Sequence, residues 1–181
     1  MICLPAAYAF ARYKLPASGL QGALIVAPMT VSTLIIGLGL LSLLSRLNVS
    51  LSLWTVGIGH VVINLPLCFA ITYAAMGDHQ KNAERAARDL GAPEWKVLTL
   101  ISAPMLAAPL AAAFFLSVTF SWDEFIIAFL LTRFDVTLPV EIWSMLRSGL
   151  SPATNAVGSL VFLVSISAVL LMEILLFRRA R

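Results

Sequence analysis

The sequence predicts an all-α membrane protein, a polytopic bundle of transmembrane helices. Of its 181 residues, 60% are hydrophobic and only 12% are charged, whereas soluble domains average about 45–50% apolar and about 25% charged residues. Charge-free apolar segments about as long as a membrane span alternate with short charged segments. The formal net charge is +3, and the basic residues form no single face, so we expect membrane lipid and no nucleic acid as a partner.

The first segment is apolar but too short to cross a bilayer. Residues 1–10 are followed at once by Arg12 and Lys14, without the small-residue cleavage site of a signal peptide. We interpret this segment as the cytoplasmic end of a span whose beginning is absent. The chain is therefore expected to hold a partial N-terminal span and four full spans.

Each of the four later apolar segments is long enough to span a membrane. The first of them would extend about 37 Å as a helix, more than the roughly 30 Å of a hydrocarbon core. The predicted spans are Leu20–Leu44, Leu51–Gly77, Pro104–Leu131 and Ala153–Phe177. Charged and apolar residues mix between the last two spans, and this predicts a loop with a short interfacial helix within residues 132–152.

A long charged segment between the second and third spans predicts a helical hairpin, residues 78–104. In its first helix, an alanine-rich face permits close contact with a partner. On another face, Glu84 and Arg85 each precede a residue of opposite charge by four positions, Arg88 and Asp89, which is typical of an exposed helix. The alanine-rich face consists of Ala83, Ala86, Ala87 and Leu90.

Glycine and proline delimit the two helices of this hairpin. Gly91 is expected to stop the first helix, and Pro93 suits the first position of the second helix, where Glu94 also favours helix initiation. Pro104 is expected to end the second helix, because proline cannot continue the backbone hydrogen-bonding pattern. The sequence thus predicts two short helices outside the membrane, joined by a turn at Gly91.

The distribution of basic residues orients the predicted bundle. Nine basic residues fall on the side that carries the hairpin and the C-terminus, and three fall on the other side. By the positive-inside rule, the hairpin and the C-terminus are cytoplasmic. The nine are Arg12, Lys14, Lys81, Arg85, Arg88, Lys96, Arg178, Arg179 and Arg181, and the three are Arg46, Arg133 and Arg147.

Several residues within the spans are interpreted as structural. His60 is expected to hydrogen-bond between helices, and Cys3 and Cys68 are expected to be separate free thiols with no redox function. Four glycines are expected where helices pack closely, since no phosphate-binding loop pattern exists in the chain. These glycines are Gly37, Gly39, Gly57 and Gly59.

Asp123 and Glu124 form the acidic pair of the third predicted span. A carboxylate within a span costs about 2.5–3.5 kcal/mol or more, so it is seldom there without a partner or a pathway. Adjacent residues point about 100° apart on a helix, so we expect one to face a transport path and the other a neighbouring helix. With Trp122 beside them they suit a solute with positive amines. The alternative is an interfacial pair that reaches water.

Catalytic chemistry is not expected of this acidic pair. Glycoside hydrolysis or a metal site requires a cleft and further ligands, which the sequence does not supply. We therefore predict no catalytic residue, no metal and no cofactor.

The hairpin resembles the cytoplasmic coupling loop of ABC importer permeases. That loop has the pattern Glu-Ala-Ala, three residues, Gly, nine residues, Ile-x-Leu-Pro. Here Arg85-Ala86-Ala87, Gly91 and Ile101-Ser102-Ala103-Pro104 keep the full spacing. Arg85 stands in place of the family glutamate, with Glu84 one residue earlier, and Ala103 stands in place of leucine.

Segments elsewhere extend this resemblance to the spermidine/putrescine permeases. They are Pro5–Arg12, Leu65-Pro66, Trp122–Phe125 and Thr137–Arg147. The resemblance implies a single domain, residues 1–181, with the fold of a type I ABC importer transmembrane domain. Because members of that family have six spans, the chain would lack the first span and most of the second, through a wrongly chosen start or a truncated gene.

The same resemblance implies a mechanism and a set of partners. The hairpin would dock in a groove of an ABC ATPase subunit, which hydrolyses ATP, so the chain itself would not be an enzyme. A second, homologous permease subunit and an extracytoplasmic solute-binding protein would complete the importer. The complex would move polyamines across the bacterial inner membrane by alternating access.

Two alternatives remain open from the sequence. Within the permease class, the solute is another organic cation, an opine-like amine or a metal ion. Outside it, the chain is an intramembrane enzyme or a channel subunit in which Asp123 and Glu124 are catalytic or filter residues.

Overall fold

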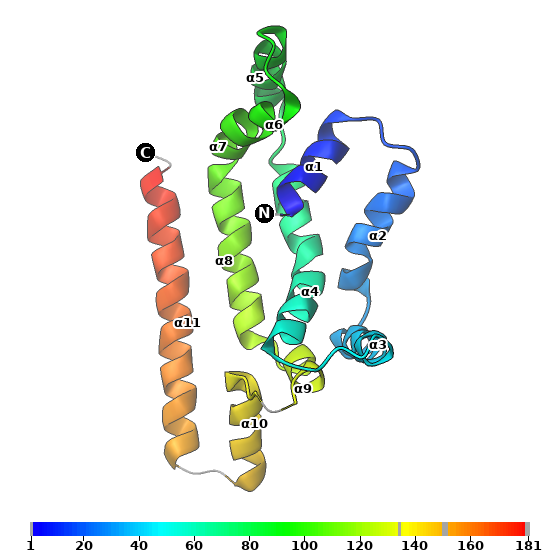
Figure 1. Ribbon diagram of the computed structural model, residues 1–181. Helices are drawn as coiled ribbons and strands as arrows, with labels where there is room; N and C mark the ends of the chain where they lie inside the picture. The colour runs from blue at the N-terminus through cyan, green and yellow to red at the C-terminus, as the bar shows by residue number, and fades with distance from the viewer. Residues whose placement is uncertain (1, 134, 150–151, 180–181) are drawn as a thin grey trace.

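A computed structural model describes residues 2–133, 135–149 and 152–179, and over these ranges the chain forms helices and no strands. Three long helices, α4, α8 and α11, run along one common direction, with bounds Leu53–Ala74, Ala107–Asp123 and Pro152–Arg179 (Figure 1). The hairpin projects from one end of this bundle, and α3, α9 and α10 lie at the opposite end. The predicted all-α class is confirmed.

The first predicted full span is broken. Helix α1 (Cys3–Arg12) precedes α2 (Ser18–Thr30) and α3 (Thr33–Arg46), and α2 and α3 meet at an angle of 108°. The prediction of one continuous helix over this region is therefore wrong. The break falls in the sequence Thr-Val-Ser-Thr, whose β-branched and hydroxyl side chains favour helix poorly, and the backbone at Val31 is extended.

The second predicted span forms a single helix, α4. The backbone N–H of Ser52 donates to the Thr55 hydroxyl at 2.9 Å, and the backbone N–H of Thr55 donates to the carbonyl oxygen of Ser52 at 3.1 Å, so these two residues fix its start. Among the segments whose side chains are fully described, α4 alone is long and apolar enough to cross a membrane by itself, and the part of α11 described in this way, Thr154–Ser167, is a shorter apolar helix. Two bent helix pairs pass the same test when each is counted as one span, which raises the number to three.

The third predicted span also divides into two helices. Helix α8 ends at Asp123, and α9 (Ile126–Leu131) follows after two residues that leave the helical pattern. The carboxylate of Glu124 accepts hydrogen bonds from the backbone N–H groups of Ile126 and Ile127, at 3.0 and 3.2 Å. It thereby caps the start of α9. The prediction of one continuous helix over the third span is therefore wrong.

The last two helices follow the sequence prediction. The expected short helix between the third and fourth spans is α10 (Leu138–Ser148). The fourth predicted span is α11, whose 28 residues extend about 42 Å at about 1.5 Å per residue. Its C-terminal part lies at the same end of the molecule as the hairpin (Figure 1).

Short helix α9 occupies the centre of the hydrophobic core. Its residues Ile127, Ala128 and Leu131 have no exposed surface, and they pack with Leu44 of α3 and Val56 of α4. The Thr55 hydroxyl donates a hydrogen bond of 2.8 Å to the carbonyl oxygen of Leu131. This bond ties the end of α9 to the start of α4.

The outer sides of the helices carry many exposed apolar side chains. Burial of these side chains requires lipid or other membrane helices around the bundle, because contiguous apolar surface of this extent is rare on soluble monomers. Examples from α2, α4, α8 and α11 are Leu20, Leu24, Ile58, Phe114, Leu160, Phe162 and Leu163.

Two of the four glycines expected at close helix contacts occupy such positions. A Cβ atom at Gly37 would lie 2.6 Å from a methyl carbon of Leu130, and one at Gly59 would overlap Cγ2 of Ile127. Gly39 and Gly57 have open space at the same place, so the prediction is wrong for them. Close packing of α9 therefore depends on Gly37 and Gly59.

We expect Gly59→Ala to destabilise the protein by about 1–3 kcal/mol, because the branched Ile127 side chain must move to admit the new methyl group. The measurement is the melting temperature of the protein purified in detergent. Gly57→Ala is the matched control, since it changes the same helix two residues away without a contact. Equal melting temperatures for the two variants would contradict the packing assignment.

Candidate functional site

The hairpin has the two-helix shape that the sequence predicts. Helix α5 (Asp78–Asp89) leads into a turn, and the second arm runs through α6 (Glu94–Lys96), the π-helix η1 (Val97–Ser102) and α7 (Ala103–Met105). Pro93 precedes the second arm as its N-cap rather than as its first helical residue. Pro104 does not end this arm, which continues to Met105 and then bends by 76° into α8.

Gly91 closes the first arm with a Schellman motif. Its φ of 80° lies in the left-handed region that glycine adopts without strain. The N–H of Gly91 donates to the carbonyl of Arg88 at 2.8 Å, and the N–H of Ala92 donates to the carbonyl of Ala87 at 3.0 Å. The glycine therefore sets the angle between the two arms.

The buried and exposed residues of α5 are not grouped as the sequence predicts. Ala87 and Glu84 are buried against the rest of the protein, whereas Ala86 is exposed and Leu90 is 89% exposed. The four residues of the predicted alanine-rich face therefore do not share one environment. The exposed tip of the hairpin presents Leu90 and Trp95, two large apolar side chains, and Arg85 of α5 is exposed as well.

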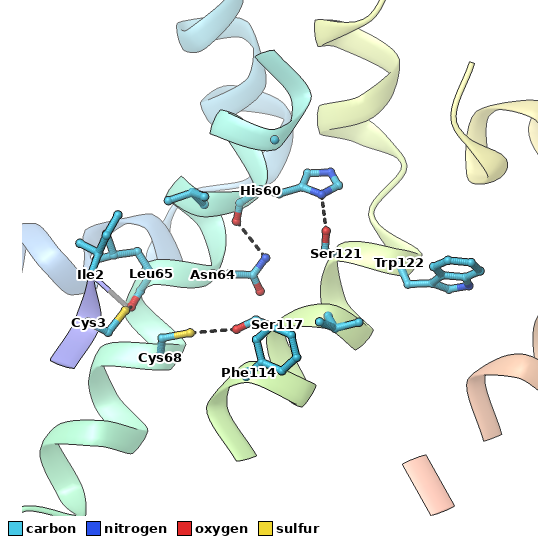
Figure 2. A pocket seen from close by; sticks show the side chains of 13 residues that line it. Ile2, Cys3, His60, Asn64, Leu65, Cys68, Phe114, Ser117, Ser121 and Trp122 are labelled. Carbon is cyan, nitrogen blue, oxygen red and sulfur yellow. Dashed lines mark hydrogen bonds between the residues drawn. The ribbon is translucent and has the colours of Figure 1, made fainter. Parts of the chain in front are cut away.

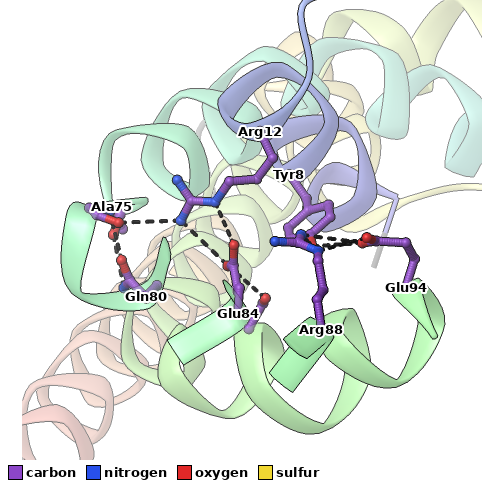
Figure 3. Close-up of polar contacts among 9 residues, drawn as sticks. Tyr8, Arg12, Ala75, Gln80, Glu84, Arg88 and Glu94 are labelled. Atoms are coloured by element: carbon purple, nitrogen blue, oxygen red, sulfur yellow. Dashed lines mark hydrogen bonds and ion pairs between the residues drawn. The ribbon is translucent and has the colours of Figure 1, made fainter. Parts of the chain in front are cut away.

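Glu84 is the centre of a buried polar cluster that joins the hairpin to α1 (Figure 3). Its carboxylate lies 2.6 Å from Nε of Arg12, and it accepts a hydrogen bond of 2.8 Å from the Ser102 hydroxyl. Arg12 also donates to the carbonyl oxygen of Gly77 at 3.2 Å. The side chains of Glu84 and Arg12 are 1% and 7% exposed. The predicted pairing of Glu84 with Arg88 on an exposed face is therefore wrong.

Tyr8, Arg88 and Glu94 form a second polar group beside this cluster (Figure 3). Arg88 pairs with Glu94 at 2.7 Å, and the Tyr8 hydroxyl donates to Glu94 at 3.0 Å while it accepts a bond from Arg88. The hydrogen bond from Arg88 lowers the pKa of Glu94, and the bond to Glu94 raises the pKa of Arg88. One side chain of α1 thus contacts both arms of the hairpin.

A cavity of about 630 Å³, the central cavity, lies between α1, α4 and α8. Polar side chains of α4 and α8 face each other along it (Figure 2). His60 is hydrogen-bonded to Ser121, and the thiol of Cys68 lies 2.8 Å from the Ser117 hydroxyl. The amide of Asn64 donates to the carbonyl oxygen of His60 at 2.9 Å. The predicted role of His60 as a hydrogen-bonding group between helices is confirmed.

The two cysteines meet at this cavity instead of lying apart. Cys3 of α1 and Cys68 of α4 both line it. Cys3 also contacts the carbonyl oxygen of Leu65 at 3.7 Å. Both cysteines are free thiols, as predicted, but sequence separation gave no sign of their proximity.

The predicted path residues lie at different places around the cavity. Trp122 lines it, whereas Asp123 is an exposed residue at the end of α8 and Glu124 caps α9. Their role in transport stays a prediction. Sequence reasoning missed Asn64, Ser117 and Ser121, although the i, i+4 spacing of small polar residues on two apolar helices is a signal for them.

The side chains that line the cavity determine how it can contact a solute. No aspartate or glutamate is among its lining residues in the described part of the chain. The described residues also hold no group of three or more His, Cys, Asp or Glu that is placed to bind a metal ion. The cavity can therefore contact a solute through hydroxyl, amide, imidazole, thiol and aromatic groups.

Residues 4–181 match one protein family, which is described as the binding-protein-dependent transport system inner membrane component. The chain belongs to this family. The match includes α1 from Leu4 onward, the hairpin, α4 and α8, so the polar clusters and the α4 and α8 walls of the central cavity lie within a membrane transport component. Family membership confirms the predicted class of polytopic membrane permease.

Several permease proteins named for polyamine transport are similar to this chain. The spermidine/putrescine transport system permease protein PotC of Escherichia coli is 26% identical over 171 residues, which are 93% of this chain and 64% of that protein. PotC of Haemophilus influenzae is 24% identical over 170 residues, 93% and 66% respectively. The putrescine transport system permease protein PotI of Escherichia coli is 29% identical over 145 residues, 76% and 52% respectively.

The chain spans less than two thirds of the length of the relatives it matches. The predicted resemblance to spermidine/putrescine permeases is confirmed at this level of identity.

We expect Glu84→Ala to destabilise this permease by about 3–5 kcal/mol, because it leaves the Arg12 guanidinium buried without a countercharge. The measurement is again the melting temperature in detergent. Asp89→Ala, at an exposed position of the same helix, should change stability by no more than about 0.5 kcal/mol. Similar melting temperatures for both variants would show that the ion pair of Glu84 with Arg12 does not stabilise the protein.

Proposed function

We propose that the chain is a permease subunit of an ATP-driven importer that moves polyamines into the cytoplasm by alternating access. The observation that carries the proposal is the hairpin with its exposed tip, in a chain that belongs to a family of binding-protein-dependent transport components. A hairpin fastened to the bundle at its base and free at its tip is suited to dock in a groove of an ATPase subunit.

The tip supplies the docking surface in this proposal. Leu90 and Trp95 are large apolar side chains held 89% and 63% exposed, and such residues at the end of a rigid support are typical of binding anchors. Arg85 is an exposed charge available for a contact with the ATPase, whereas Glu84 is engaged with Arg12. Ala86 lets a partner surface approach the backbone of α5 closely.

The orientation follows from charge and from the placement of the segments. The hairpin, the connection between α1 and α2, and the C-terminal part of α11 lie at one end of the molecule (Figure 1). These segments contain nearly all of the nine basic residues on the basic side of the chain. The positive-inside rule then assigns this end, with the hairpin and the C-terminus, to the cytoplasm.

Polyamines are the proposed solute. Two kinds of relative are named for spermidine/putrescine and putrescine transport. In the central cavity, Trp122 can contact an ammonium group through its ring, and the oxygen atoms of Asn64 and Ser121 can accept its hydrogen bonds. Neutral groups bind a dication less tightly than carboxylates do, which suits a site that must release its solute.

A second candidate solute follows from the same neutral lining. A cavity without a carboxylate among its described lining residues also suits an organic cation of lower charge or an opine-like amine. In that case the solute-binding protein supplies most of the selectivity. The permease role and the ATPase docking are the same for both solutes.

The importer needs further subunits in this proposal. ABC ATPases hydrolyse ATP, a second homologous permease pairs with this chain, and an extracytoplasmic binding protein delivers the solute. The exposed apolar sides of α2, α8 and α11 provide surface for the second permease as well as for lipid.

The proposal predicts ATP-dependent uptake of radiolabelled putrescine or spermidine by cells that produce the chain with the ATPase, permease and binding protein of its own organism. The host strain must lack its own polyamine importers. A choline-type cation in parallel distinguishes the second solute. Uptake of neither solute, with all subunits present in the membrane, would contradict the function.

We expect Gly91→Leu to abolish most uptake while the protein still inserts in the membrane. A branched side chain at φ 80° is strained, so the angle between the hairpin arms changes. Gly91→Asn is the matched control, because asparagine tolerates the left-handed region, and it should retain much of the uptake. Unchanged uptake by the leucine variant would refute the docking role of the hairpin.

A further inference from the structure

We infer that helix α1 transmits movement of the hairpin to the central cavity, and that Tyr8 and Arg12 are the positioning residues that fasten α1 to the hairpin. The inference rests on the proposed function, in which an ATPase moves the hairpin. It assigns the mechanical link between the docking surface and the solute cavity to a particular helix.

The C-terminal half of α1 is fastened to both arms of the hairpin. Arg12 pairs with Glu84 of α5, and this carboxylate also accepts the hydroxyl of Ser102 in the second arm. Tyr8 contacts Arg88 of α5 and Glu94 of α6 (Figure 3). Because both arms are held, a rigid-body movement of the hairpin displaces this end of α1.

The N-terminal end of the same helix forms part of the cavity wall. Ile2 and Cys3 line the central cavity, and Cys3 lies beside Cys68 of α4 (Figure 2). Helix α1 has 10 residues without a break, so about 15 Å of continuous helix connects the two ends. Movement at Arg12 is therefore delivered to the cavity wall at Cys3.

The covalent connections of the hairpin are less suited to this task. Residues 75–77, between α4 and α5, are not helical, and the second arm reaches α8 through the bend at Leu106. Interruptions of this kind absorb changes of backbone angle, as hinges do. The non-covalent route through α1 has no such interruption between the hairpin contacts and the cavity.

The packing of α1 permits it to slide rather than to separate from the bundle. Leu4, Ala7 and Tyr8 are buried, and the ring of Phe10 meets that of Phe69 on α4 edge to face, with centroids 5.3 Å apart. Small sliding of packed helices is a common form of domain movement. A slide along α4 changes the cavity surface at Cys3 and leaves the buried core around α9 intact.

The native cysteines allow a direct test. The chain has two cysteines, so Cys68→Ser leaves Cys3 as its single thiol. The variant is assembled with a cysteine-free second permease and ATPase in proteoliposomes, and the rate at which N-ethylmaleimide modifies Cys3 is measured without nucleotide and with ATP and vanadate. We expect the nucleotide to change this rate by about fivefold or more.

Variants of the positioning residues separate transmission from docking. In Arg12→Gln and in Tyr8→Phe, each in the Cys68→Ser background, the ATPase should still co-purify, but the effect of nucleotide on Cys3 modification should fall severalfold. Lys14→Gln is the matched control, since Lys14 is an exposed cation two residues from Arg12, and it should keep the full effect. The Tyr8→Phe variant retains the buried ion pair and so serves if Arg12→Gln fails to fold.

The outcomes are distinct. A nucleotide effect that persists in the Tyr8 and Arg12 variants, or that is absent from the parent while the ATPase is bound, would overturn the role of α1 and leave the proposed function standing. Failure of the ATPase to bind the parent complex would refute the proposed function, and the role of α1 with it.

Discussion

The need to neutralise one buried carboxylate determines how the hairpin is held. Glu84 is 1% exposed, and an unpaired charge in such a place is strongly destabilising. Arg12, Ser102 and the carbonyl of Gly77 together satisfy the ion pair, which brings α1, both arms of the hairpin and the connection between α4 and α5 to one point. With Glu84 turned inward, the helical period places Ala86 and Leu90 outward. The exposure of the hairpin tip is thus a consequence of the burial of Glu84 where the hairpin meets the bundle.

The opposite end of the bundle obeys a similar constraint on backbone groups. Helices that stop within apolar surroundings leave N–H and C=O groups that must find partners inside the protein. Glu124 accepts the first N–H groups of α9, and the Thr55 hydroxyl donates to the carbonyl of Leu131 at its end. A six-residue helix can therefore lie in the core. The space it needs is provided by Gly37 and Gly59, which bring α3 and α4 close to it.

The structural features that depend on a few neighbouring residues could be predicted from the sequence. The length and apolarity of α4, the two arms of the hairpin and the turn at Gly91 follow from segments of a few residues. The partner of Glu84 lies 72 residues away in sequence, so an i, i+4 rule selected Arg88 instead. The break at Val31 has a local signal in the Thr-Val-Ser-Thr sequence, which favours helix poorly but is not visible in hydropathy. The division at Glu124 depends on the packing of α9 against α3 and α4, which hydropathy does not encode either. Of the cavity residues, His60 and Trp122 were identifiable as isolated polar or aromatic residues in spans. Asn64, Ser117 and Ser121 became meaningful only when α4 and α8 were placed face to face.

The capped start of α9 also bears on which charges the interior tolerates. The first backbone N–H groups of a helix carry partial positive charge, and in membrane transport proteins such half-helix ends commonly attract anionic groups. Here a carboxylate of the chain itself already occupies that position. The helix end is therefore electrically screened from within, and it presents neither a trap for an anion nor an electrostatic barrier to a cation that passes nearby.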